Sequence, residues 1–273
     1  MSEIDALISL LADDDPETTR ETLAALLNYD DTLLAGYIRA NQESADPRVR
    51  RHIHQLEAIL TLRSRRRSFA ARLADPDTDL LEGLIEVHLQ WYDNDNPDVV
   101  RNYYRDFLTH SRKFDLTTMN RLADYMRRNG FTAPEEKEIT FPEHYCLGSV
   151  LDSRRGADVI LCAVARSFAA VQGLEVEIAR FMGTFVLINR SSGELLTPEK
   201  QWRLTEHSPS TAVVCRNNQI LRYVMQMLFS YAVEANSFRY IHTLYCAITG
   251  EPDNRPPEYL PYPFNPNNPP PLT

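Results

Sequence analysis

The sequence lacks the features of a membrane or secreted protein. It contains no run of about 18 apolar residues, the length that a membrane-spanning helix needs. Its first fifteen residues, MSEIDALISLLADDD, have no basic start and so do not resemble a secretory signal. We therefore expect a cytoplasmic protein with no membrane segment.

Several site signatures are missing as well. The cysteines form no CxxC pair, and the HExxH, GxSxG and glycine-rich phosphate-loop motifs are absent. We therefore expect no metal site and no cofactor. The wide spacing of the cysteines predicts reduced thiols rather than a disulfide framework at Cys146, Cys162, Cys215 and Cys246.

Basic residues are fewer than acidic ones. The 273 residues include 29 Lys and Arg and 38 Asp and Glu, which gives a net charge of −9. Nucleic-acid affinity comes largely from Lys and Arg, so this balance argues against a general nucleic-acid binder. The exception is the stretch from Arg48 to Arg72, where eight arginines accompany one acid, Glu57. This stretch either meets an anionic partner or pairs with the protein's own acids. Phe69 is its one aromatic residue, so we expect no tight nucleic-acid binding.

What is present is an ordinary globular composition, with 43% hydrophobic and 25% charged residues. Residues 1–131 are predicted to form a helical region, in which apolar residues recur at helical spacing. An Asp or Asn before Pro is typical of a helix start, and it occurs at Asp15-Pro16, Asp46-Pro47, Asp75-Pro76 and Asn96-Pro97. The polar segment 132–140 is predicted to be a linker.

Residues 141–250 are predicted to form a second region of mixed structure. We expect an apolar helix at 158–172, strands at 175–181 and 184–188 in a small antiparallel sheet, and helices at 218–234 and 236–249. Residues 251–273 hold a dense run of prolines, which excludes a helix. We expect this tail to pack in extended form as far as Phe264, because four large apolar side chains alternate with its prolines.

Cys162 is the sharpest chemical candidate. It falls in the first turns of the predicted helix 158–172, and a helix N-terminus stabilises a thiolate. A nucleophilic cysteine also needs a base, normally a histidine. The alternative is a cysteine buried in the core, which apolar neighbours such as Leu161 and Val164 favour. We predict the buried state, with slow alkylation.

Four segments carry a resemblance to a known family. LGSVLDSRRG at 147–156, VILCAVAR at 159–166, GLEVE at 173–177 and MGTFVL at 182–187 run in its order and spacing. In these segments the chain resembles the SirB-type, transglutaminase-like family. The resemblance implies an α+β, papain-like core, in which a nucleophile-bearing helix packs on a small antiparallel sheet.

The resemblance also assigns site positions, and two of them are replaced. Cys162 stands at the nucleophile position, Thr184 at the position of the catalytic His, and Thr197 at that of the Asp. A Thr hydroxyl cannot hold a proton near neutral pH, so it cannot act as the base. Another histidine would have to substitute, and His144 and His207 are the candidates nearest in sequence.

These observations predict a mostly helical α+β protein with a transglutaminase-like core. The leading hypothesis is a catalytically degenerate protein that binds a protein partner or acts as a scaffold. The alternative is a cysteine-dependent acyl transferase or hydrolase that uses Cys162 and a relocated histidine.

Overall fold

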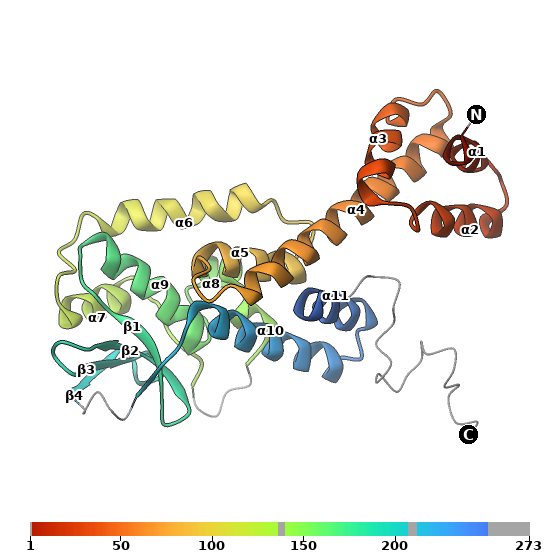
Figure 1. Ribbon diagram of the computed structural model, residues 1–273. Coiled ribbons are helices and arrows are strands. Elements are labelled where there is room, and N and C mark those ends of the chain that lie inside the picture. The colour runs from red at the N-terminus through yellow and green to blue at the C-terminus, as the bar shows by residue number, and fades with distance from the viewer. Residues whose placement is uncertain (1, 136–139, 207–211, 251–273) are drawn as a thin grey trace, which may run out of the picture. The chain divides into compact units, whose positions relative to one another are not determined.

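A computed structural model describes residues 2–135, 140–206 and 212–250 (Figure 1). It divides the chain into two compact units, Met1–Arg65 and Arg66–Thr273. The predicted tail and His207 lie outside the described residues. No helix in the described ranges is both long enough and apolar enough to cross a bilayer.

The first unit is helical. It contains α1 (Glu3–Leu10), α2 (Pro16–Leu26), α3 (Asp31–Asn41) and the first part of α4 (Pro47–Ala74). Side chains of Ser2, Asp15 and Asp30 accept hydrogen bonds from the first turns of α1, α2 and α3, which fixes where these helices begin. Its core consists of buried aliphatic side chains from all four helices, including Ile8, Leu26, Leu34 and Leu56.

The Pro-containing start signals hold at three of the four predicted places. Helices begin at Pro16, at Pro47 and at Pro97, the last being the first residue of α6 (Pro97–Ser111). The prediction at Asp75-Pro76 is wrong. Asp75 Oδ1 accepts the N–H of Asp77 at 2.9 Å in a turn, and α5 (Leu80–Trp91) is capped by Asp79 instead.

The arginine-rich stretch lies in α4, as a helix, and several of its charges meet the protein's own acids. In the first unit, Arg48 pairs with Asp14 and Asp46, and Arg63 lies 3.5 Å from Asp31 while donating to the carbonyl of Leu27. These contacts neutralise charge that the sequence alone leaves open to an anionic partner.

The second unit combines helices with one sheet, which confirms the predicted α+β class. After α5 and α6 come α7 (Met119–Arg128), η1 (Pro142–Tyr145), α8 (Leu147–Ser153) and α9 (Asp158–Val171). Helices α10 (Asn217–Glu234) and α11 (Phe238–Thr249) follow the sheet. The strands are β1 (Glu177–Phe181), β2 (Thr184–Asn189), β3 (Glu194–Thr197), β4 (Arg203–Glu206) and β5 (Val213–Val214), and η2 (Pro198–Lys200) lies between β3 and β4.

The sheet is antiparallel with strand order β4-β3-β2-β1-β5, and α9 packs against β1 and β2. Ile178 pairs with Leu187, and Leu187 pairs with Leu196, so these three side chains lie in a row across the sheet. They belong to the same core as α9. The opposite face carries a separate apolar cluster that includes Ala179, Val186, Ile188 and Leu195.

The observed division of the chain differs from the predicted linker at 132–140. Trp202 Nε1 donates to the carbonyl of Phe131 at 2.7 Å, and the N–H of Thr132 donates to the carbonyl of Arg154 at 2.9 Å. These bonds attach the end of α7 to the sheet and to α8. Helices α5 to α7 therefore share one core with α9, and the division falls at Arg65, inside α4.

Candidate functional site

Cys162 lies in the second turn of α9, as the sequence predicts. The helix begins at Asp158 and ends just before Gly173, whose positive φ of +73° is incompatible with a right-handed helix. Apolar residues surround Cys162, and its exposed fraction is 0%. No hydrogen bond joins the Cys162 sulfur to any described residue.

The surroundings of Cys162 oppose ionisation. Burial raises the pKa of its thiol well above the ordinary value, and the carboxylate of Asp158, one turn earlier on α9, raises this pKa further. Arg166, one turn later, acts in the opposite direction but does not outweigh burial. A nucleophilic cysteine needs a thiolate that reaches substrate, and Cys162 meets neither condition.

The two threonines lie on the other side of the sheet from α9. Side chains alternate between faces along a strand, and Phe185 and Leu187 of β2 pack in the α9 core. Thr184 is two residues before Val186 on the same strand, so both side chains lie on the opposite face of the sheet. By the same alternation on β3, Leu196 faces α9 and Thr197 does not.

Their contacts fit a structural role. Thr184 Oγ1 donates to the carbonyl of Phe181 at 3.1 Å across the β1–β2 turn, and Thr197 is buried at the end of β3, paired with Arg203. The structure therefore brings β2 to α9 but does not turn Thr184 or Thr197 toward Cys162.

Asp158 is the polar group at the N-terminus of α9, and the sequence reasoning missed its role. Its Oδ1 accepts the N–H of Val159 and its Oδ2 accepts the N–H of Phe185, both at 2.6 Å. Burial raises the pKa of this carboxyl to about 6, although the two backbone hydrogen bonds act to lower it. A signal was available, since a carboxylate in the first turn of a helix is favoured by the helix dipole.

Aromatic residues gather beside Asp158. The rings of Phe185 and Tyr223 lie 4.8 Å apart, and the Arg180 guanidinium lies over both, at 5.3 and 5.5 Å from their centroids. The Asp158 charge also raises the pKa of Tyr223, although burial is the larger cause. The start of α9 is thus covered by aromatic side chains.

Of the predicted substitute bases, His144 lies near this end of α9. Its carbonyl accepts the N–H of Ala157 at 2.9 Å, while its Nδ1 accepts the N–H of Phe141 at 3.1 Å. Another cysteine, Cys246, does meet a histidine, and its sulfur lies 3.7 Å from Nε2 of His242 on α11. Neither contact involves Cys162.

A separate cleft of about 1230 Å³ lies beside the C-terminal half of α9. Its lining includes Asp77 and Asp79 from the loop before α5, and Arg101 and Tyr104 from α6. It also includes Arg166 and Ser167 from α9, and Glu177 from β1. Burial lowers the pKa of the Arg166 guanidinium, while Asp79 acts to raise it. Sequence reasoning missed this cleft, because its walls are up to about 140 positions apart in the chain.

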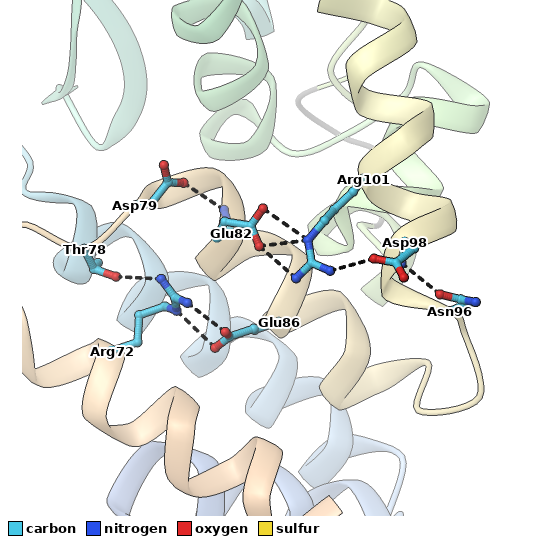
Figure 2. Close-up of polar contacts among 8 residues, drawn as sticks. All are labelled: Arg72, Thr78, Asp79, Glu82, Glu86, Asn96, Asp98 and Arg101. Atoms are coloured by element: carbon cyan, nitrogen blue, oxygen red, sulfur yellow. Dashed lines mark hydrogen bonds and ion pairs between the residues drawn. The ribbon is translucent and has the colours of Figure 1, made fainter. Parts of the chain in front are cut away.

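An ion pair joins two residues of the cleft lining, Glu82 and Arg101 (Figure 2). Glu82 on α5 accepts hydrogen bonds from Nε and Nη2 of Arg101 on α6, at 3.0 and 2.9 Å. Arg101 Nη1 also donates to Asp98, so its charge is matched by two carboxylates. Arg72 on α4, which does not line the cleft, donates two hydrogen bonds to Glu86 on α5.

The described residues contain no group of three or more His, Cys, Asp or Glu side chains placed to hold a metal ion. The candidate site therefore has two parts on one helix. These are a closed N-terminal end around Asp158 and Cys162, and an open cleft at Arg166.

Comparison with known proteins supports the family resemblance in part. The model of the transglutaminase-like superfamily matches residues 98–204, which run from α6 to β4 and include α9 with Cys162. No curated protein and no solved structure matches the chain. Residues 98–204 of this chain are a transglutaminase-like superfamily domain.

Proposed function

We propose that this protein is a catalytically degenerate, SirB-type member of the transglutaminase-like superfamily that binds a protein partner. The observation that carries the proposal is the burial of Cys162, which has an exposed fraction of 0%. A substrate carbonyl cannot reach a sulfur atom that solvent does not reach.

The electrostatics around Cys162 support the same proposal. The nearest charged group toward the N-terminus of α9 is a carboxylate, Asp158, where a thiolate needs a positive neighbour. On the sheet, Phe185 occupies the position that faces α9, and its ring can neither accept nor donate the proton that acyl transfer moves. The scaffold of the superfamily is thus kept while its chemistry is not supported.

An acylation experiment tests the proposal. The native protein is incubated with p-nitrophenyl acetate, with and without a primary amine as acceptor, and release of p-nitrophenol and acylation of each cysteine are followed. We expect no release above that of Cys162→Ala, which lacks the sulfur atom. The matched control is Cys215→Ala, since Cys215 is a half-buried thiol outside α9.

The result that contradicts the proposal is a burst of p-nitrophenol that Cys162→Ala abolishes and Cys215→Ala retains. That result would favour the alternative, a cysteine-dependent acyl transferase or hydrolase with a relocated histidine. His144→Ala would then test the histidine whose backbone lies at the start of α9.

A further inference from the structure

Arg166 is a half-buried cation that forms no ion pair with a described carboxylate, although burial lowers its pKa and the charges of Asp79 and Glu177 lie close enough to act to raise it. It extends from α9 into the lining of the cleft, and its Nη2 donates to Oδ1 of Asn217 at 2.9 Å. A guanidinium has five N–H donors and stays charged in proteins. A half-buried charge is costly unless it is paired, so this group is suited to bind an anion.

The other arginines of the cleft are either paired with carboxylates or exposed to solvent. Arg101 is bound by Glu82 and Asp98 (Figure 2), and Arg190 forms an ion pair with Glu177. Arg105 is exposed and donates to Asn102 at 3.2 Å. Arg166 is therefore the arginine of this cleft that has a neutral partner on a neighbouring helix and lies partly out of solvent.

The orientation of Arg166 is fixed before any ligand arrives. Asn217, at the start of α10, uses its Oδ1 for Arg166 and its Nδ2 to donate to the carbonyl of Thr78 at 2.8 Å. The loop before α5 and two helices thus hold one edge of the guanidinium. A preorganised, planar guanidinium matches the two oxygens of a carboxylate better than it matches a spherical anion.

The surrounding charges decide what kind of anion fits. Asp77, Asp79 and Glu175 are exposed on the lining of the same cleft. They repel a ligand with several negative charges, such as a nucleotide, but they attract a cation placed a few ångströms from the anion. The cleft therefore favours a ligand with one carboxylate followed by a positive group.

The remaining lining and the size favour a peptide. Leu81, Leu108, Val171 and Val176 are half-buried on the lining and offer apolar contact. A volume of about 1230 Å³ exceeds the roughly 300–1,000 Å³ of small-molecule sites, so several residues of a chain have room.

We propose that this cleft binds the C-terminal end of a partner protein. The terminal carboxylate pairs with Arg166, an apolar last side chain contacts the aliphatic lining, and a Lys or Arg a few residues upstream meets Asp77 and Asp79. This inference rests on the proposed protein-binding function and names the chemistry of the partner.

The test uses the full-length protein and two synthetic pools of six-residue peptides with randomised sequence. The pools differ only in the C-terminus, which is a free carboxylate in one and a carboxamide in the other. Bound peptides are identified by mass spectrometry, and the affinities of the best ones are measured by fluorescence anisotropy. We expect the acid pool to yield peptides with an apolar last residue and an upstream Lys or Arg.

Two variants locate the contact. Arg166→Gln should weaken binding of the best acid peptide by at least about tenfold, because it removes the charge that pairs with the terminal carboxylate. A factor of ten in affinity is about 1.4 kcal/mol. Arg105→Gln removes an exposed arginine that lines the same cleft, and it should leave the affinity within about twofold, since exposed charges contribute little. Circular dichroism checks that both variants are folded.

Three outcomes contradict the inference: no peptide of the acid pool binds, amide peptides bind as well as their acids, or N-acetyl-leucine binds as tightly as the best peptide. The last outcome would assign the cleft to small organic acids. The comparison of acid with amide uses the unaltered protein, so it decides even if Arg166→Gln does not fold. A failure here leaves the acylation result at Cys162 unaffected, so the two proposals fail separately.

Discussion

Oδ2 of Asp158 accepts the backbone N–H of Phe185 at 2.6 Å, and this bond joins the first turn of α9 to the start of β2. By the resemblance noted in the sequence, these are the two elements expected to carry the nucleophile and the base. Here the link is made by a carboxylate and a backbone amide. The same carboxylate lies one turn before Cys162 and opposes formation of a thiolate there.

Asp158 should titrate near pH 6. Burial raises the pKa of its carboxyl from 3.8 to about 6. Between these two values the folded state binds more protons than the unfolded state, so the free energy of unfolding falls as pH rises from about 4 to 6 and stays lower above that range. Carbon-13 NMR of the carboxyl measures the pKa directly, and a value near 4 would contradict this prediction.

The pH dependence of stability gives an independent check on Asp158. A shift of two pKa units corresponds to about 3 kcal/mol, which is an upper value for a group that keeps some solvent contact. In Asp158→Asn the part of the pH dependence between pH 4 and 6 that comes from this carboxyl should disappear. Thr184→Ala, which alters the neighbouring residue of Phe185 without removing a charge, is the control and should keep the dependence.

Gly148→Ala should destabilise the second unit by about 1–3 kcal/mol, as overpacking of a core usually does. A Cβ at this position on α8 would lie 2.7 Å from Cε1 of His88. His88 is 2% exposed and its Nε2 is bound to Asp95 at 2.9 Å, so the ring cannot move without losing that bond.

The control for this glycine is Gly36→Ala. Gly36 lies inside α3, and a Cβ there would meet nothing within 4 Å. Ala should stabilise the helix by about 0.5–1 kcal/mol relative to Gly. Thermal unfolding followed by circular dichroism compares the two variants. A Gly148→Ala protein with an unchanged melting temperature would show that the contact with His88 relaxes freely.

The pair Arg72–Glu86 should contribute more than a surface ion pair. Nε and Nη2 of Arg72 donate to the two carboxylate oxygens of Glu86 at 3.1 and 2.8 Å, and the side chains are 25% and 21% exposed. A double-mutant cycle with Ala at both positions should give a coupling of about 1.5 kcal/mol, since hydrogen bonds to charged groups contribute more than neutral ones.

The matched pair for this cycle is Arg127–Asp124, which lies in the same unit with side chains 48% and 53% exposed. Its coupling should be below about 0.5 kcal/mol. Urea unfolding followed by tryptophan fluorescence suits both cycles, because Trp91 and Trp202 lie in the second unit. Equal couplings in the two cycles would contradict the argument from burial.

The arginine-rich stretch in α4 should not bind nucleic acid tightly. Anisotropy titrations with single-stranded and duplex oligonucleotides should show at most weak binding at low salt, which disappears at about 0.15 M, where the Debye length is about 8 Å. Submicromolar binding at the higher salt would mean that the ion pairs of Arg48 and Arg63 do not neutralise enough of the positive charge of α4 to prevent nucleic-acid binding.

The elements with strong local signals were predictable from sequence. Helix α9 follows from its apolar residues and from Gly173 beyond its end, and strands β1 and β2 follow from alternating residues around the Met182-Gly183 turn. The short strands β3, β4 and β5 carry two to four residues each, too few for a pattern, and they form through pairing with β2 and β1.

The site was less predictable, because it depends on contacts between distant residues. Which face Thr184 occupies follows only from the pairing of β2 and from the side of the sheet that α9 covers. The junction of Arg166, Asn217 and Thr78 joins three segments that no sequence pattern connects. The division at Arg65 lies inside one continuous helix, where the sequence gives no linker signal.

The most direct test of the central claim is alkylation of the native protein with iodoacetamide near pH 7, with each cysteine followed by mass spectrometry. Cys162 is 0% exposed with a raised thiol pKa, whereas Cys215 is half-buried. The account predicts that Cys162 stays unmodified while Cys215 reacts slowly, and that both react once the protein is unfolded in guanidinium chloride. Rapid and selective modification of Cys162 in the folded protein would contradict the account and indicate a nucleophilic cysteine.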